Sequence, residues 1–373
     1  MKIKKSILIV CALIWGPVEG KTYDFANGMQ FDIRGYAGWR QIFSDVQFDS
    51  IPSAPELGLA TSLKVTDRLN IFNQFKYGTT LSNVLVYNQI NYTPYIPIDS
   101  LELTLNGGRV WYDNNLYNIT RVNPRTRQGV FQPQAIYWDT LARSITSGDG
   151  IGFDLKYKDF NMSYIIDKQI TTNKNTEARA WTTYPINRMS STFGNHQMVA
   201  VGFDFPEYGI RTKASWNHSL FNITNKPKNI NINDFIVEYF FAGVEWTHNK
   251  WIVAVETINV RDAELSWADR LNKNYGASGT ITYELCNYVD VRFNFNQYVS
   301  APRPPLQADY RSQANRFKDV NFGFNFHTGP WMANVEMHWM QGARIVDPSN
   351  YVADPQSYTN YYVVGTNLVY FFE

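Results

Sequence analysis

Apolar residues recur at every second position through most of the chain, in segments of about ten residues. One segment places Phe31, Ile33 and Trp39 on one face and Asp32 and Arg34 on the other. A period of two belongs to a β-strand with one apolar face, because successive side chains point to opposite sides of a sheet. Sixteen such segments between residues 28 and 372 predict an all-β chain.

The connections between these segments alternate between short and long. Short turns are expected at 66–68, 93–100, 158–159, 206–208, 248–250, 285–288 and 328–330, and long connections at 42–55, 111–149, 167–196, 217–233, 261–273, 300–317 and 341–359. Only the connection at 78–83 is short where a long one is expected. This alternation is typical of a transmembrane barrel, with short turns on one side and long loops on the other. We predict an antiparallel β-barrel of about sixteen strands, and two segments of ambiguous phase leave fourteen or eighteen as alternatives.

The apolar faces must meet either a second sheet, as in a soluble β-sandwich or propeller, or lipid. Two features favour lipid. The opposite faces are rich in Asn, Gln, Asp and Arg, as a wet interior requires. Aromatic residues stand at the strand ends, where a barrel meets the two membrane interfaces: Trp39, Tyr77, Tyr157, Phe160, Trp216, Trp246, Trp251, Tyr283, Trp331, Trp339 and Tyr370. Beyond residue 20 no apolar run reaches eighteen residues, so no transmembrane helix is expected.

The first twenty residues have the pattern of a secretory signal peptide. A basic stretch with Lys2, Lys4 and Lys5 precedes an apolar stretch, and cleavage is expected after Gly20. We therefore expect residues 1–20 to be a signal peptide, with a membrane anchor as the alternative, and 21–373 to be a single transmembrane barrel. Cleavage removes three of 34 basic and one of 33 acidic residues, which leaves a net charge of −1 and no basic field for nucleic acid. Cys286 then has no intramolecular partner.

Two segments carry a resemblance to a known family. The chain ends Leu368-Val369-Tyr370-Phe371-Phe372, which is similar to the aromatic C-terminal signal of outer-membrane proteins, although Glu373 follows the final aromatic. The stretch from Leu116 to Arg127, followed by 133–137, resembles a loop of porin-like proteins from marine and enteric bacteria. Over nearly its whole mature length the chain resembles Gram-negative outer-membrane porins. The resemblance implies an outer-membrane location, contact of the last strand with the assembly machinery, a homotrimer, and a third long loop folded into the lumen.

The third long connection, 111–149, is the longest, and a structureless loop of this length is uncommon unless it is functional. The spacing of Trp138, Leu141, Ala142 and Ile145 predicts a short helix packed against the barrel wall. Arginines at a narrowing can replace part of the hydration shell of an anion. The alternatives are a lid over the mouth and arginines that only pair within the loop. The candidate constriction residues are Arg121, Arg125, Arg127, Arg143, Asp113 and Asp139.

Charges on the polar strand faces nearly cancel. Since screening at physiological salt hides charges beyond about 8 Å, selectivity is expected at the narrowest point. We expect passive diffusion of small hydrophilic solutes and ions, with a weak preference for anions and without cofactor or metal. The candidate residues of the lumen wall are Arg34, Arg40, Arg211, Lys213, Arg292, Asp290 and Glu336.

Sequence signals for an enzyme are weak. The chain contains no G-x-S-x-G, H-E-x-x-H, P-loop or nucleotide-binding motif. His338 follows Glu336 by two residues, so both lie on the lumen face of one strand, and we favour a hydrogen-bonded pair. The alternatives are a barrel-embedded hydrolase that uses this pair and a secreted β-rich carbohydrate-binding protein. We therefore expect a channel and not an enzyme.

Overall fold

The computed structural model describes residues 21–25, 27–44, 53–78, 81–111, 116, 147–169, 189–190, 194, 196–223, 234–264, 272–300, 315–341 and 360–372. The strands are β1 (Lys21–Asp24), β2 (Gln30–Ser44), β3 (Ser53–Thr66), β4 (Leu69–Gly78), β5 (Leu81–Tyr92), β6 (Leu101–Trp111), β7 (Ser147–Tyr157), β8 (Phe160–Gln169), β9 (Met189–Ser190), β10 (His196–Phe205), β11 (Ile210–Ile223), β12 (Asp234–His248), β13 (Trp251–Glu264), β14 (Asn272–Cys286), β15 (Val289–Ser300), β16 (Asn315–Thr328), β17 (Trp331–Gln341) and β18 (Asn360–Phe372). A short 3-10 helix, η1 (Pro206–Tyr208), joins β10 to β11. Within the ranges that the structure describes, no helix is long and apolar enough to cross a bilayer.

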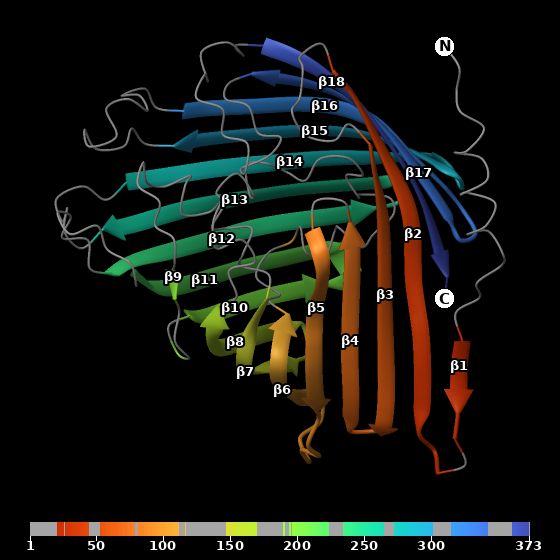
Figure 1. Ribbon diagram of the computed structural model, residues 1–373, viewed down its shortest axis with the longest axis vertical. Helices are drawn as coiled ribbons and strands as arrows, with labels where there is room; N and C mark the ends of the chain where they lie inside the picture. The colour runs from red at the N-terminus through yellow and green to blue at the C-terminus, as the bar shows by residue number, and fades with distance from the viewer. Residues whose placement is uncertain are drawn as a thin grey trace.

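Sixteen of these strands form one closed antiparallel barrel (Figure 1). Each strand pairs with the next along the chain, β8 pairs directly with β10, and β18 pairs with β2 to close the ring. The two remaining strands are short: β1 has four residues and β9 has two. Closure leaves no strand with a free edge along the barrel, as a hydrocarbon environment requires. The predicted all-β barrel and its strand number are confirmed.

The alternation of short and long connections is also present. At one end of the barrel β7 leads to β8 across two residues, and at the other end β6 stops at Trp111 and β7 starts at Ser147. The connection between β4 and β5, which the sequence predicts to be short where a long one is expected, is two residues long. Several strands extend into the expected connections: β11 runs to Ile223, into the connection expected at 217–233, and Asp149 lies within β7 and not in the loop. Its place in the ladder opposite Arg109 extends the strand into the expected loop.

Exposure alternates along the strands as the period-two pattern predicts. On β17, residues from Met332 to Met340 are buried at every second position, and those between them point outward. On β12 the ambiguous segment resolves as expected, since Val244 and Trp246 are exposed whereas Glu245 is buried. The barrel therefore has an apolar outer face and a largely polar inner face.

Strand β5 explains why its segment is ambiguous in sequence. Its pairing with β4 shifts between Gln74 and Phe75 and again between Lys76 and Gly78. An extra residue in one strand moves the following side chains to the other face, so the alternation changes phase inside the strand. The apolar period of this segment is therefore broken by a bulge and by Asn88 on the outer face.

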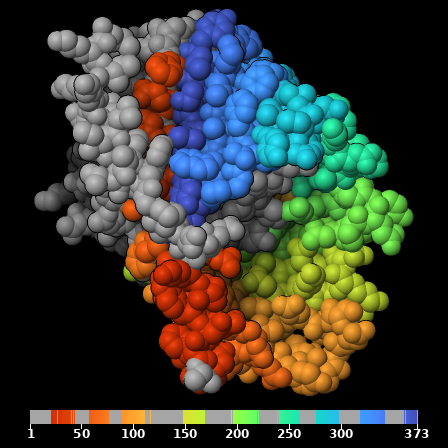
Figure 2. Space-filling model, turned by 90° about the vertical axis from the view of Figure 1, so that its right-hand side faces the viewer, coloured from red at the N-terminus to blue at the C-terminus, as the bar shows by residue number. Residues whose placement is uncertain are grey.

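The seam between the first and last strands contains β1. β18 pairs with β2 from Ser44 to Gly35, and β1 pairs with the same strand from Ile33 to Gln30. β1 therefore continues along the edge of β2 that β18 leaves unpaired. Figure 1 places the C-terminal end just above β1, and Figure 2 shows the red N-terminal strands beside the blue last strand.

The inner face is not polar throughout, in contrast to the wet interior expected from sequence. Ile165, Met198, Phe241, Ile252 and Ile258 point inward and are at most 4% exposed. Buried apolar side chains on an inner wall are stabilised only where other chain segments cover them. This part of the lumen is therefore packed and not lined by water.

Candidate functional site: the inner wall of the barrel

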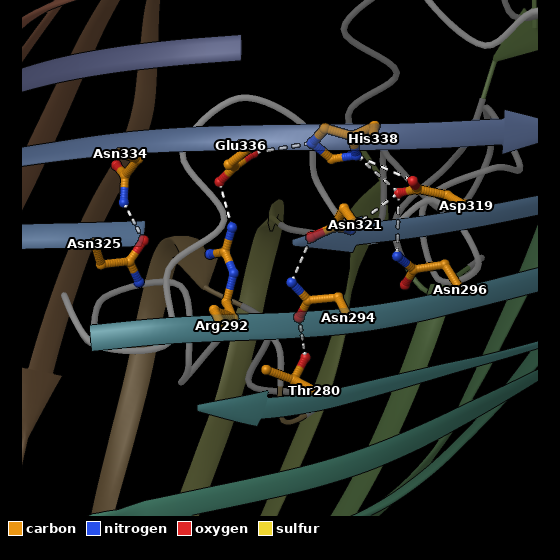
Figure 3. A network of polar contacts seen from close by, with 10 residues as sticks. All are labelled: Thr280, Arg292, Asn294, Asn296, Asp319, Asn321, Asn325, Asn334, Glu336 and His338. Carbon is orange, nitrogen blue, oxygen red and sulfur yellow. Dashed lines mark hydrogen bonds and ion pairs between the residues drawn. The ribbon is translucent and has the colours of Figure 1, made fainter. Parts of the chain in front are cut away.

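A network of polar side chains covers the inner face of β14–β17 (Figure 3). Its central ion pair joins Arg292 on β15 to Glu336 on β17, two strands that are separated by β16. Gly323 on β16 stands in register between them. A Cβ at Gly323 would lie 3.4 Å from Arg292 Nη2 and 2.9 Å from the carbonyl oxygen of Val335. The missing side chain gives the guanidinium room to cross β16.

His338 extends this ion pair along the wall. Its Nε2 lies 3.2 Å from Glu336 Oε2, and its Nδ1 lies 3.0 Å from Asp319 Oδ1. Ionised carboxylates only accept hydrogen bonds, so both contacts are satisfied when both ring nitrogens carry protons. In that form two cations, Arg292 and His338, balance two anions, Glu336 and Asp319. All four side chains are at most 2% exposed, and buried charges of this kind persist only when they are paired.

Amide side chains connect the charged group to neighbouring strands. Thr280 Oγ1 donates to Asn294 Oδ1 at 2.6 Å, and Asn294 Nδ2 donates to Asn321 Oδ1 at 2.6 Å. Asn321 Nδ2 in turn donates to Asp319 Oδ2 at 3.2 Å. A second contact joins Asn334 Nδ2 to Asn325 Oδ1 at 2.6 Å. These bonds link four adjacent strands and fix the inner side chains against the wall.

The predicted wall residues whose side chains are described lie on the inner face, but several differ from expectation in their exposure. Arg292, Asp290 and Glu336 are fully buried and Lys213 is 6% exposed, so they do not border open water. They also bond along the wall: Asp290 Oδ2, for example, lies 2.8 Å from His327 Nε2.

The other predicted wall cations differ from this buried group. Arg211 is more accessible and lies 3.0 Å from Glu245 and 3.9 Å from Asp204. Arg34 is exposed on β2. Arg40 lies in the same strand, and its side chain is outside the described part of the chain.

Sequence reasoning missed Asp319 and Gly323 as members of the site. Asp319 directly precedes the apolar segment that starts at Val320, and its place in the alternation is that of an inward-facing residue. Gly323 gives no signal of its own, because its role depends on which residues of β15 and β17 stand beside it.

The predicted constriction residues Arg121, Arg125, Arg127, Arg143, Asp113 and Asp139 all lie outside the described residues. One member of the same connection is described. Leu116 is 2% exposed, and its backbone N–H donates to Glu256 Oε1 at 3.0 Å. Its Cδ1 would lie 2.6 Å from a Cβ at Gly243. Glu256 and Gly243 face each other on the inner side of β12 and β13, so Leu116 lies inside the barrel.

The described side chains give no indication of a metal centre. No group of three or more His, Cys, Asp or Glu among them could hold a metal ion. The inner wall therefore offers charged groups, hydrogen bonds and a packed apolar region.

No family model matches the sequence, and no curated protein matches it. Solved structures do match. The anion-selective porin from Comamonas acidovorans superposes with a TM-score of 0.65 at 8% identity, over 92% of this chain and 100% of that one. OmpF of Salmonella typhi, in complex with daunomycin, gives 0.62 at 13% identity over 94% and 100%. OmpT of Vibrio cholerae gives 0.60 at 10% identity over 94% and 100%. The barrel has an apolar outer face and the fold of bacterial outer-membrane porins.

Proposed function

We propose that this protein forms a water-filled channel in the bacterial outer membrane, through which small hydrophilic solutes and ions diffuse passively. The observation that carries the proposal is the closed sixteen-strand barrel with an apolar outside and a charged inside. A barrel of this strand number encloses enough space for an aqueous passage. Solved structures of the same fold include an anion-selective porin and an outer-membrane channel of Acinetobacter baumannii, DcaP.

The connection after β6 folds inward and narrows the passage in this proposal. Two observations support it: Leu116 lies against the inner face of β12 and β13, and the inner apolar side chains Phe241 and Ile258 are buried. Arg121, Arg125 and Arg127 then outnumber the acids near the narrowing. Asp149 does not offset them, since it lies in β7 and pairs with Arg109 at 3.1 Å. A weak preference for anions follows.

Single-channel recording in a planar bilayer tests the channel itself. Purified protein should give discrete conductance steps, and a membrane that stays silent at saturating protein would contradict the proposal. Reversal potential in a KCl gradient then gives the sign of the selectivity. The combined change Arg121→Ala, Arg125→Ala and Arg127→Ala should move that potential toward cation preference.

The matched control for the loop is Arg34→Ala, which removes an exposed cation from the wall and leaves the loop intact. We expect this control to move the reversal potential less than the triple change does. A shift at Arg34 together with no shift in the triple variant would place the narrowing on the wall and would exclude the three loop arginines.

We propose a structural role for the Glu336–His338 pair, in place of a hydrolase centre. Both ring nitrogens of His338 already contact carboxylates, which leaves neither nitrogen to activate a nucleophile. His338→Gln should therefore leave the conductance steps in place. Hydrolysis of a lipid or peptide substrate that is lost in His338→Gln would favour the enzyme instead.

A further inference from the structure

The connection between β5 and β6, residues 93–100, differs from the others at the end of the barrel where short turns join the strands. The connections that follow β3, β7, β12, β14 and β16 each contain two residues, whereas this one contains eight. Figure 1 shows it projecting beyond the lower ends of β5 and β6. Two residues suffice to join neighbouring antiparallel strands, so the additional length needs another explanation.

Two prolines keep this connection out of the sheet. β5 pairs with β6 only as far as Tyr92, which stands opposite Leu105. Proline has no backbone N–H, so Pro94 and Pro97 cannot donate to a strand ladder. Residues 93–97 form neither helix nor strand. Prolines spaced by three residues favour the extended polyproline helix, which has three residues per turn and leaves its backbone groups free of internal hydrogen bonds.

The connection exposes apolar side chains. Tyr95 is 70% exposed, the largest fraction among the large apolar residues that the structure describes as exposed. Ile98 is 55% exposed, and Pro97 between them is exposed as well. Adjoining exposed apolar side chains of this kind mark surfaces that bind another molecule.

Contacts with the neighbouring turn hold the connection in place. The N–H of Thr93 donates to the carbonyl oxygen of Arg68 at 2.8 Å, and the N–H of Leu101 donates to that of Ile98 at 3.2 Å. The guanidinium carbon of Arg68 lies 5.3 Å from the centre of the Tyr95 ring, within the range of a cation–π contact. A segment that is already ordered loses less conformational entropy when it binds a partner.

Arg68 adds a positive charge beside these apolar side chains. The adjacent acid, Asp67, contacts Lys64 at 2.7 Å. Arg68 itself forms no ion pair with any residue that the structure describes. Its charge is therefore available to a carboxylate of a partner that approaches the connection.

We propose that residues 94–98 bind a soluble periplasmic protein, in a groove that is lined by aromatic side chains and flanked by a carboxylate. The proposal rests on the proposed function, because a barrel in the outer membrane turns its short connections toward the periplasm. With three residues per turn, Pro94 and Pro97 form one edge of the segment and Tyr95 and Ile98 form the next. Aromatic grooves recognise proline-containing segments of this shape, and the carboxylate pairs with Arg68.

Photo-cross-linking tests the segment in the full-length barrel. p-Benzoylphenylalanine replaces Tyr95, and outer-membrane vesicles that carry this variant are illuminated with the soluble proteins of the periplasm. We expect one protein adduct that a synthetic peptide of residues 92–99 suppresses, whereas the same peptide with alanine at both proline positions does not. The matched control carries the photoreactive residue at Tyr208, which is 67% exposed on η1, and should not give this adduct.

The outcomes that would overturn the proposal are equally specific. They are the absence of a protein adduct, an adduct with lipid alone, the same adduct from the Tyr208 position, and an adduct that the proline-containing peptide leaves unchanged.

Binding of the protein that the adduct identifies separates the prolines from the charge. Pro94→Ala combined with Pro97→Ala should raise its Kd for the vesicles about tenfold. Arg68→Glu should raise the Kd more at low than at high ionic strength, because salt screens an exposed charge pair. Tyr208→Ala should leave the Kd unchanged. An unchanged Kd in the double proline variant would contradict the proposal.

Conductance distinguishes this proposal from the proposed channel. The double proline variant should keep the conductance steps of the parent chain, because both prolines lie outside the barrel strands. A parent chain that stays silent in the bilayer but still forms the adduct would refute the channel and retain the docking segment. A conducting parent chain without the adduct would refute the docking segment alone.

Discussion

The walls formed by β3–β5 and by β15–β17 share the same alternation of side chains but differ in where their polar groups lie. On β15–β17 polar groups such as Arg292, Glu336 and His338 point inward and bond one another, and the outer face carries side chains such as Phe322 and Met337. On β3–β5 amides also point outward. Lipid tails offer no donors or acceptors, so polar groups on an outer face cost more free energy than polar groups on the inner face.

The largest expected effect is on the inner side of β15–β17. Arg292→Met leaves Glu336 buried without its strongest partner, and loss of one member of a buried ion pair costs about 3–5 kcal/mol. Urea unfolding from lipid vesicles should show this decrease in the free energy of unfolding. The double variant Arg292→Met with Glu336→Leu should recover most of it, since no uncompensated charge remains. A double variant as unstable as the single one would mean that packing and not charge accounts for the effect.

An arginine introduced on the outer face should destabilise the two walls to different degrees. Val335→Arg places a charge at mid-height on the lipid side of β17, which should cost about 2–4 kcal/mol. Asn88→Arg places the same charge on β5 and should cost less in the monomer, because that position is already polar. Unfolding of both variants from vesicles gives the difference. Equal costs would remove the distinction between the walls at this depth.

A glycine on the inner face, Gly323 of β16, can be compared with a glycine on the outer face, Gly279 of β14. Gly323→Ala brings a methyl group within 2.9 Å of the Val335 carbonyl oxygen and 3.4 Å of Arg292 Nη2. We expect a loss of about 1–3 kcal/mol, as in other overpacked sites. Gly279→Ala on β14 meets no atom within 4 Å and is the matched control, with an expected change within about 0.5 kcal/mol. Unfolding midpoints that agree for the two variants would contradict the role assigned to Gly323.

The smallest effect is expected at the turn after β3. Lys64 Nζ lies 2.7 Å from Asp67 Oδ1, and this contact holds the pKa of the Asp67 carboxyl below its usual value. Because the folded pKa is lowered, the stabilising contribution is present above the unfolded pKa and is lost as the pH falls through the folded one. Lys64→Met should raise the pKa of Asp67, as measured by NMR titration. Stability near neutral pH should barely change, since this pair is exposed in contrast to the ion pair of Arg292.

The sequence was sufficient to predict strands, faces and strand number, because alternation is a local property that each segment carries by itself. The apolar alternation is interrupted at Asn73, where the structure places a polar residue on the outer face. The alternation also changes phase near residues 84–92, where the pairing of β5 contains bulges. Both irregular places belong to adjacent strands, β4 and β5.

Within the inner network the contact of Glu336 with His338 was predicted, because both residues lie on one strand. The contacts between strands could not be predicted, because they depend on the register of neighbouring strands. Arg292 and Glu336 are 44 residues apart in sequence, and only the alignment of β15, β16 and β17 places Gly323 between them. The burial of these charged side chains could not be predicted either. The alternation along a strand predicts which side chains face inward, but it does not predict what covers them.

The pairing of β18 and β1 along the same edge of β2 would allow the chain to be circularly permuted. Phe372 stands opposite Gly35 and Lys21 opposite Ile33, so β18 and β1 run in the same direction along one edge, with a single position between them. Glu373 supplies one residue, the number that this position needs. A circular permutant with a peptide bond from Glu373 to Lys21 would merge both pieces into one unbroken strand. New ends opened in the connection 342–359 should then yield the same barrel, because connections between strands tolerate such cuts better than the strands themselves.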